Sequence, residues 1–400
     1  MSKFKKNLKY LPVLVLALGC VGITSGFQAI AIIIFLYCLF KEKEQYGYKT
    51  FFADDAVRRS LIFIFLWLLC VTASDLISKE NMRSLKATWN YLERMLPFFC
   101  VGFFALYDKK FLKFAWVGLC VGMLFANIDV FYNLVLQGHW RPRTIFSNPN
   151  RLGAFIIMLL PFVVCGTYQF RKNRLVVLIG GVLSILGLIS LVISGSRGAM
   201  LGLMGGCLFA FIIFSIKQGD MKKVCKILLF GGVLVCCIIG ITYYFYPGMV
   251  TRSYDMERVY LWQSSLKMIA DYPMWGVGEG NFNKIYINNG YVNALARELT
   301  LPHPHNTYLY YFVERGIFVG IAFILMMLSQ VYILSKNILT KYENINMFVF
   351  AGLIMVIGAI IHGFVDVVWD NNRIYQLMYW FLYGVACYSI VLDKDDKESV

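Results

Sequence analysis

LVVLIGGVLSILGLISLVI, residues 175–193, is a stretch of nineteen residues without a single charge. A helix needs about 20 mostly apolar residues to cross the hydrocarbon core of a bilayer. Similar stretches recur along the chain, of which 59% is hydrophobic and only 15% charged. A soluble protein of 400 residues would normally carry more charge. The sequence therefore predicts an all-α polytopic membrane protein.

We expect twelve membrane-spanning helices, because lipid offers backbone polar groups no partner outside a helix. The first two, divided near residues 24–26, are short enough to form one bent helix. The basic N-terminus followed by an apolar run also resembles a secretory signal, but the many later spans favour an uncleaved first helix. The expected spans are 10–23, 27–40, 61–77, 88–106, 111–128, 152–170, 175–193, 198–216, 225–246, 306–334, 346–367 and 374–392.

The distribution of basic residues predicts the orientation. With the N-terminus inside the cell, most of the 38 Lys and Arg residues lie in inner segments, so the net charge of +15 mainly reflects topology. Nucleic acid is therefore not an expected partner. None of the eleven cysteines falls in an outer segment, so we expect no disulfide framework. The expected location is the cell inner (cytoplasmic) membrane.

We divide the chain into N-terminal transmembrane helices (1–140), a core (141–334) and C-terminal transmembrane helices with a short cytoplasmic tail (335–400). The core contains one large outer loop, 247–305. Within that loop Val259, Trp262, Leu266 and Ile269 share one helical stripe, and Pro273 ends the helix. We expect an amphipathic helix that lies on the bilayer surface or caps the bundle.

Two of the four histidines, His303 and His305, lie in a segment where prolines 302 and 304 favour an extended chain. Asn306 is a good N-cap, which puts His305 at the start of a helix. The helix dipole there disfavours imidazolium, so His305 is a candidate catalytic base. The alternatives are an interfacial histidine or half of a His-x-His metal site. We expect His303 and Asn306 to support the site.

Three candidate anion-binding sites contain arginine. In Ser194-Gly-Ser196-Arg197, serines would cap the next helix, and Arg197 would bind phosphate at its N-terminus. Arg258 lies on the amphipathic helix. Between residues 141 and 151, Asn-Pro-Asn predicts a turn and three arginines form a basic patch, with Arg143 and Asn150 as supporting residues. Each has an alternative. Arg197 would be an arginine at the end of a span that extends its charge to the membrane interface, and Arg258 would lie on a solvated helix face. Residues 141–151 would be an ordinary polar loop.

Further charged residues flank the expected last spans. Glu314 and Arg315 lie roughly 13 Å along the helix from His305, and at that depth they need a partner or a polar cavity. The sequence is equally consistent with a structural ion pair of these two residues and with a role for Glu314 in supporting the site of His305. For Asp366, Asp370 and Arg373, around the last outer loop, a structural salt bridge is favoured over sugar or ion binding.

Four motifs occur together and in order. Phe146–Asn150, Ser196–Ala199, Gly276–Phe282 and His305-Asn306 with Glu314-Arg315-Gly316 resemble the O-antigen ligase family, which includes O-antigen polymerases and protein O-oligosaccharyltransferases. The similarity covers residues 140–330. It implies a GT-C-like glycosyltransferase that needs neither metal nor other cofactor. It also implies that His305 is the catalytic residue and that Arg197 and Arg258 hold a diphosphate.

The resemblance implies transfer of a glycan from undecaprenyl diphosphate to an acceptor hydroxyl, such as lipid A core, at the outer (periplasmic or extracellular) face. We expect a single inverting displacement. The expected partners are this donor, a lipid or glycan acceptor and membrane lipids. One alternative is a polymerase of polysaccharide repeat units. A lipid-linked glycan transporter is another, although transporters place polar residues near the midplane and this chain gathers them at one face.

Overall fold

The computed structural model describes residues 10–398 with short gaps. Every regular element in this described part is a helix, so the chain is an all-α polytopic membrane protein, as predicted. The residues outside the description are 1–9, 22–28, 30–32, 34–35, 38–39, 41–47, 79–80, 104–108, 139–140, 143, 147, 221, 223, 227, 233–243, 245–253, 298–300, 302, 341–344, 368, 370–372 and 399–400.

Seven of the described helices are long and apolar enough to cross a membrane, and α2 and α17 are shorter apolar helices. The expected spans 27–40 and 225–246 lie largely outside the described residues. The helices are α2 (Leu11–Val21), α4 (Tyr48–Ala53), α5 (Asp55–Ile77), α6 (Asn81–Phe103), α7 (Lys109–Gln137), α8 (Pro149–Gln169), α9 (Arg174–Ser194), α10 (Arg197–Lys217), α13 (Tyr254–Asp271), α14 (Phe282–Asn288), α15 (Thr307–Arg315), α16 (Ile317–Thr340), α17 (Met347–Gly363) and α18 (Arg373–Glu398).

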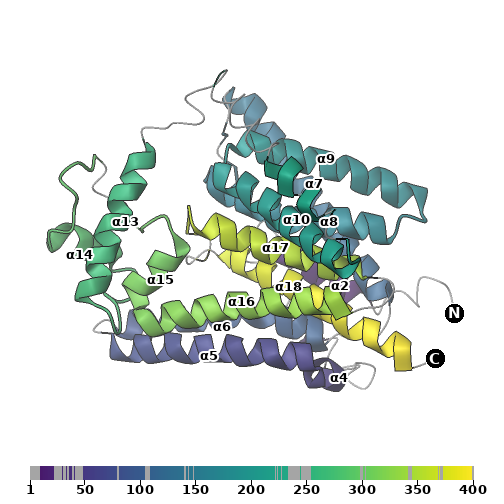
Figure 1. Cartoon of the computed structure of the whole chain (residues 1–400), viewed down its shortest axis with the longest axis horizontal. Coiled ribbons are helices and arrows are strands. Elements are labelled where there is room, and N and C mark those ends of the chain that lie inside the picture. Colours follow the sequence, from purple (N-terminus) through teal and green to yellow (C-terminus); the bar gives the residue numbers. More distant parts are fainter. Residues whose placement is uncertain are drawn as a thin grey trace.

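The long helices form one bundle, and α13, α14 and α15 gather at one end of it (Figure 1). Helix α17 packs against both α8 and α10, α18 packs against α6, and α16 packs against α5. The C-terminal end of α18 lies at the opposite end of the bundle from α13 and α14 (Figure 1). This separation agrees with the predicted arrangement, in which the outer loop and the C-terminal tail lie on different sides of the membrane.

The expected span 306–334 is wrong as a single helix, because the chain divides it into α15 and α16 at Gly316. Gly316 has φ of 83°, and a Cβ on it would lie 2.1 Å from the carbonyl oxygen of Met274. Only glycine fits this combination of backbone conformation and close approach. The amide of Ile317 donates to Pro273 O at 2.9 Å. The break therefore joins the start of α16 to the segment that follows α13.

The predicted helix in the outer loop is α13, and it ends at Asp271 as expected. On its predicted apolar stripe Val259, Trp262 and Ile269 are half-buried and Leu266 is 59% exposed. The fully buried apolar residues Leu261 and Met268 lie beside that stripe. Ser264, a polar residue off that stripe, is also buried, and its hydroxyl donates to Tyr291 O at 2.6 Å. The side of α13 that packs is thus chosen by its contacts with the loop after α14. The apolar spacing alone did not identify it.

Candidate functional site

Several helices begin or end together at what we call the site end, where α9 and α17 end and α8, α10 and α15 begin. Close contacts of small residues bring them together. A Cβ on Gly153, in α8, would lie 2.7 Å from Cβ of Ser196, and a Cβ on Gly198, in α10, would lie 2.8 Å from Cδ2 of His362. Gly198, directly after Arg197, therefore allows α10 to approach the end of α17 closely.

The segment that carries His305 is fixed to α17 and α13. Asn306 is the N-cap of α15, as predicted, and its Oδ1 accepts from the amides of Tyr308 and Leu309, each at 3.0 Å. Its Nδ2 also donates to Phe364 O at 3.0 Å. From the other side, Trp262 Nε1 donates to Pro304 O at 3.0 Å. These contacts hold His305 in place from both sides.

His305 has an unusual backbone conformation and a carboxylate partner. Its φ is 49°, a left-handed value that costs energy in a residue other than glycine and is often found at functional sites. Its Nδ1 lies 3.2 Å from Oδ1 of Asp366. When Nδ1–H donates to this carboxylate, Nε2 is left as a proton acceptor. The contact therefore suits His305 to the role of a base.

Asp366 is buried among three imidazoles. Burial by itself would raise the pKa of Asp366, but its hydrogen bond with His305 and the nearby charges of His305, His362 and His303 hold that pKa below its ordinary value. Asp366 therefore stays ionised and can stabilise an imidazolium at His305. The sequence favoured a structural salt bridge for Asp366, but the partner of Asp366 is His305. Arg373 does form a structural salt bridge, with Glu93. Asp370 lies outside the described residues.

His303 packs on His305, with the two ring centroids 4.5 Å apart. The amide of His305 donates to Nδ1 of His303 at 3.4 Å. Burial lowers the pKa of His303 to about 4, with a smaller contribution from the charge of His305. His303 is therefore neutral near pH 7. Its contacts place it against His305, and its supporting role in the site stays a prediction.

Arginines from three separate segments lie near one another at the site end. Arg141 follows α7, and its Nε donates to Ser194 O at 3.4 Å. Burial lowers the pKa of Arg141, and the nearby charges of Arg197 and Arg258 lower it further. The charge of Arg258 also acts on His362, which itself interacts with Asp366. The structure thus brings the two predicted diphosphate ligands together, next to the histidines.

The two predicted turns beside these arginines differ in detail from expectation. Ser196 holds the N-cap position of α10, as predicted, but its side chain makes no capping hydrogen bond to the helix. Asn148-Pro149-Asn150 starts α8 directly, with Asn148 as N-cap and its Oδ1 accepting from Asn150 N at 2.8 Å. Proline favours the first position of a helix. Arg143 lies outside the described residues.

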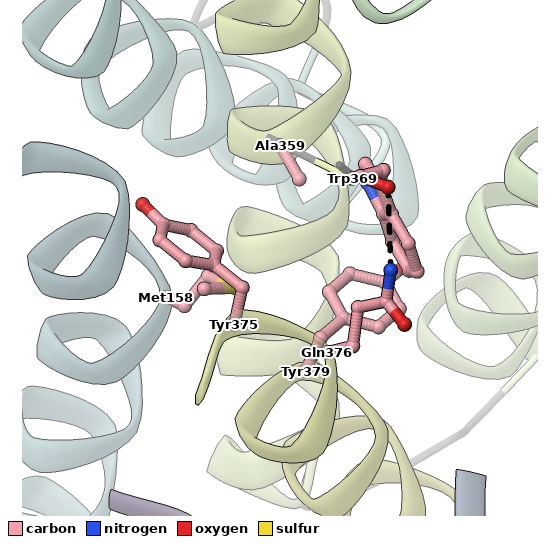
Figure 2. A pocket seen from close by; sticks show the side chains of 6 residues that line it. All are labelled: Met158, Ala359, Trp369, Tyr375, Gln376 and Tyr379. Carbon is pink, nitrogen blue, oxygen red and sulfur yellow. Dashed lines mark hydrogen bonds between the residues drawn. The ribbon is translucent and has the colours of Figure 1, made fainter. Parts of the chain in front are cut away.

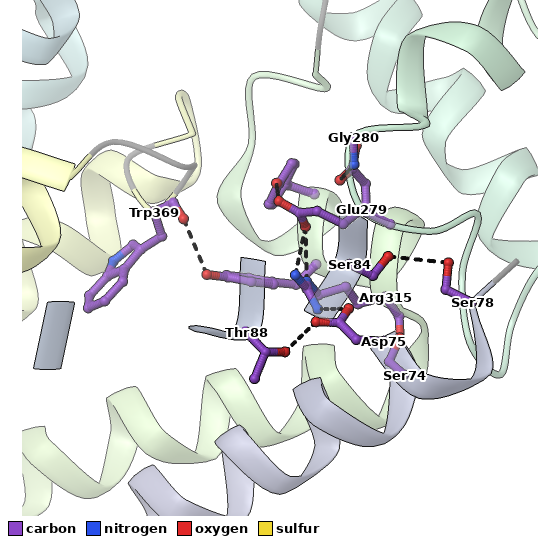
Figure 3. A network of polar contacts seen from close by, with 12 residues as sticks. Ser74, Asp75, Ser78, Ser84, Thr88, Glu279, Gly280, Arg315 and Trp369 are labelled. Atoms are coloured by element: carbon purple, nitrogen blue, oxygen red, sulfur yellow. Dashed lines mark hydrogen bonds and ion pairs between the residues drawn. The ribbon is translucent and has the colours of Figure 1, made fainter. Parts of the chain in front are cut away.

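Glu314 and Arg315 do not support His305 directly. Glu314 accepts from the amides of Gly280 and Phe282, at 2.5 and 3.2 Å. Arg315 forms ion pairs with Asp75 and Glu279 (Figure 3). The interpretation of a neighbouring ion pair is therefore confirmed for Arg315. The supporting role predicted for Glu314 in the site is wrong, because Glu314 binds the loop after α13 instead.

A small cavity inside the bundle lies close to the last outer loop (Figure 2). It encloses about 10 Å³, which leaves room for about one water molecule. Gln376 Nε2 donates to Trp369 O across it at 3.2 Å (Figure 2). This cavity is too small to hold a sugar or a prenyl chain. It is lined by Met158, Ala359, Trp369, Tyr375, Gln376 and Tyr379.

Comparison with known proteins agrees with this site. Residues 182–324 match the family model described as O-antigen ligase. This part of the chain is similar to the O-antigen ligase family. The matched O-antigen ligase region contains Arg197, Arg258 and His305, the three residues to which the motifs assign the chemistry. The family indicates a membrane glycosyltransferase-like enzyme of the O-antigen ligase or polymerase type.

A curated relative adds no functional detail to the match with the O-antigen ligase model. Over 241 residues the chain is 23% identical to an uncharacterized protein of Haemophilus influenzae. The alignment covers 53% of this chain and 57% of that protein. The chain thus spans little more than half the length of the relative that it matches.

Two residues of the site were not among the predicted site residues of this O-antigen ligase domain. Arg141 was only one of several arginines before α8, and no local signal connects it with Arg197 or Arg258. Asp366 was assigned to a structural salt bridge, and sixty-one residues separate it from His305. A histidine and an aspartate so far apart in sequence can be paired only by the packing of α15 on the end of α17.

Proposed function

We propose that this protein transfers a glycan from undecaprenyl diphosphate to an acceptor hydroxyl at the outer face of the cytoplasmic membrane. The observation that carries the proposal is the His305–Asp366 contact at 3.2 Å, placed at the same end of the bundle as Arg141, Arg197 and Arg258. Transfer of a glycan from a lipid diphosphate to a hydroxyl requires a base that takes the hydroxyl proton and cations that stabilise the leaving diphosphate.

His305 acts as the general base. Its Nε2 takes the proton of the acceptor hydroxyl while that oxygen attacks the anomeric carbon of the donor sugar. The bond from this carbon to the diphosphate oxygen breaks, and its electron pair leaves with undecaprenyl diphosphate. Asp366 stabilises the imidazolium that forms at His305. One displacement of this kind inverts the anomeric configuration, and the residues that carry it require no metal ion.

Arg197 and Arg258 bind the diphosphate and stabilise the negative charge that grows on it in the transition state. Arg197 is the first residue of α10, where the helix dipole also favours an anion. Arg258 comes from α13, so the diphosphate site needs both the bundle and the outer loop. The proposal thereby gives the outer loop a direct part in donor binding.

The first test is transfer of a purified lipid-linked glycan by the reconstituted protein. We expect His305→Ala to lower the transfer rate by about 10²–10⁴-fold, the usual contribution of general base catalysis. Lys336→Ala is the control, because Lys336 is exposed at the opposite end of α16. Undiminished transfer by His305→Ala, at equal amounts of folded protein, would refute the assignment of His305 as base.

The acceptor is tested by comparing the surface glycans of cells with and without the gene. Loss of a ligase leaves finished chains unattached to their acceptor, and this is the result that we expect. If the cells instead accumulate single repeats, the protein is a polymerase that joins one repeat to another. Intact glycans with defective movement of the lipid-linked precursor across the membrane would point to a transporter.

A further inference from the structure

A second group of charges lies completely inside the protein, apart from the histidines. The side chains of Arg315, Asp75 and Glu279 are buried. The guanidinium of Arg315 donates to Asp75 Oδ1 through Nη1 and to Glu279 Oε2 through Nε, the latter at 3.0 Å (Figure 3). Burial of three charges is costly unless their hydrogen bonds are satisfied. Their partners therefore show how the cluster is stabilised.

All four carboxylate oxygens of the cluster accept a hydrogen bond. Thr88, in α6, donates to Asp75 Oδ2, and Tyr310, in α15, donates to Glu279 Oε1 at 2.9 Å. The backbone takes part as well, because Ser74 Oγ donates to Arg315 O at 3.1 Å. Because each of these bonds has a defined direction, the cluster allows only one relative placement of α5, α6 and α15.

The cluster also fixes the outer loop. Glu279 lies between α13 and α14, in a segment that pairs with the end of α15. There the amide of Val277 donates to Val313 O and that of Gly278 donates to Glu314 O, each at 2.8 Å. Arg315 thus contacts the bundle through Asp75 and the outer loop through Glu279. The guanidinium of Arg315 therefore adds a buried ionic connection between the bundle and the outer loop to these backbone hydrogen bonds.

The two parts connected in this way are those that carry the proposed chemistry. His305 directly precedes the N-cap of α15, of which Arg315 is the last residue. Arg258 lies on α13, which packs against α15. Ten residues of chain, roughly 15 Å of helix, separate Arg315 from His305. Arg315 is too distant to act on substrate, but a shift of α15 or α13 would move the base or a diphosphate ligand.

We propose that Arg315 is a positioning residue, which through Asp75 and Glu279 sets the placement of His305 and Arg258 relative to the bundle. The inference rests on the proposed function. An error of about 1 Å in the placement of reacting groups can lower a rate by about 10²-fold. In some proteins buried ionic groups specify the relative position of structural elements even where they add little stability.

The main test is Arg315→Lys, which keeps the charge but removes the planar fork that binds two carboxylates at once. We expect the variant to fold, and its kcat for glycan transfer to fall by about tenfold or more while KM for the donor changes by less than threefold. Arg171→Lys is the control, because Arg171 is exposed at the end of α8. An unchanged kcat in folded Arg315→Lys would overturn the proposal.

A neutral triple variant separates positioning from stability. Arg315→Met alone leaves two buried carboxylates unpaired and should unfold readily. Combining it with Asp75→Asn and Glu279→Gln removes all three charges, so Tm should recover toward the wild-type value while kcat stays at least tenfold low. Recovery of kcat together with Tm would show that the cluster contributes stability alone, against the proposal. If Tm does not recover, Arg315→Lys decides.

A distance measurement tests the same inference without glycan transfer. Spin labels at Leu266→Cys in α13 and Leu328→Cys in α16, both exposed positions, report the placement of the outer loop on the bundle. We expect one narrow distance distribution, which Arg315→Lys shifts or broadens. An unchanged distribution would overturn the proposal. If the wild-type protein transfers no glycan, the proposed function fails, and this measurement still decides whether Arg315 positions α13.

Discussion

Nδ1 of His305 lies 3.2 Å from Oδ1 of Asp366, across the junction of the α15 N-terminus with the last outer loop. The same junction is held by Thr307 Oγ1, which donates to Asp366 O at 2.9 Å, and by the hydrogen bond of Asn306 with Phe364 O. His305 and Asp366 are therefore fixed by one set of contacts. Substitution of any of these residues should change the position of the His305 side chain more than it changes the packing of the helix bundle.

Asp366→Asn should lower kcat for glycan transfer by about 100-fold or more. The amide has nearly the shape of the carboxylate, but it cannot stabilise an imidazolium and can present an N–H to Nδ1, which favours the wrong tautomer of His305. Asp129→Asn is the control. Asp129 accepts hydrogen bonds from the amide of Ile145 and from Asn133. Equal rates in the two variants would contradict the pairing of Asp366 with His305.

Arg141→Ala should raise KM for the donor by about tenfold, because one hydrogen bond to a charged group contributes about 1.5–3 kcal/mol and 1.4 kcal/mol is a factor of ten. Steady-state transfer at varied donor concentration measures this change. Arg171→Ala, which removes an arginine that stacks on Tyr168 at the end of α8, should leave KM unchanged. Donor affinity that does not depend on Arg141 would exclude that residue from the diphosphate site.

Asn306→Ala should reduce both stability and transfer, whereas Asn173→Ala should reduce only stability. Each asparagine is an N-cap whose side chain accepts from a backbone amide, Asn306 in α15 and Asn173 in α9. Loss of such a cap costs about 1 kcal/mol, and thermal unfolding in detergent measures it. Asn306 also fixes the segment of His305. If both variants lost transfer to the same degree, the effect of Asn306 would be one of stability alone.

The stability of the protein should fall as the pH is lowered from 7 to 5, and His303 should account for part of the fall. Its pKa is about 4 in the folded protein, against an ordinary value of 6.5. Between these values the unfolded chain binds a proton that folded His303 does not, so stability rises with pH through this window. The contribution lost at pH 5 is about 2 kcal/mol.

His303→Gln removes that titration, so its Tm should differ less between pH 7 and pH 5 than the wild-type Tm does. The comparison needs no substrate and is independent of the proposed activity. Identical shifts of Tm in the two proteins would show that His303 is accessible to protons in the folded state.

The sequence by itself determined those features that depend only on residues close to one another in the chain. Apolar length predicted the spans, and the Asn306 cap and the end of α13 were placed correctly, because capping and helix termination are decided within one turn of helix. The family resemblance predicted roles for Arg197, Arg258 and His305 without knowledge of their distances. The break at Gly316 was missed, because it depends on contact with Met274 some forty residues earlier in the chain.

Tertiary structure alone decided which charges meet. Asp366 is the partner of His305 because α15 starts beside the end of α17, and Arg315 pairs with Asp75, 240 residues away, because α15 ends beside α5. The buried side of α13 likewise depends on the loop that covers it, so Leu266 is exposed and Ser264 is buried. Hydrogen bonds and ion pairs act over a few ångströms in space, and helix packing brings together residues that sequence spacing leaves far apart.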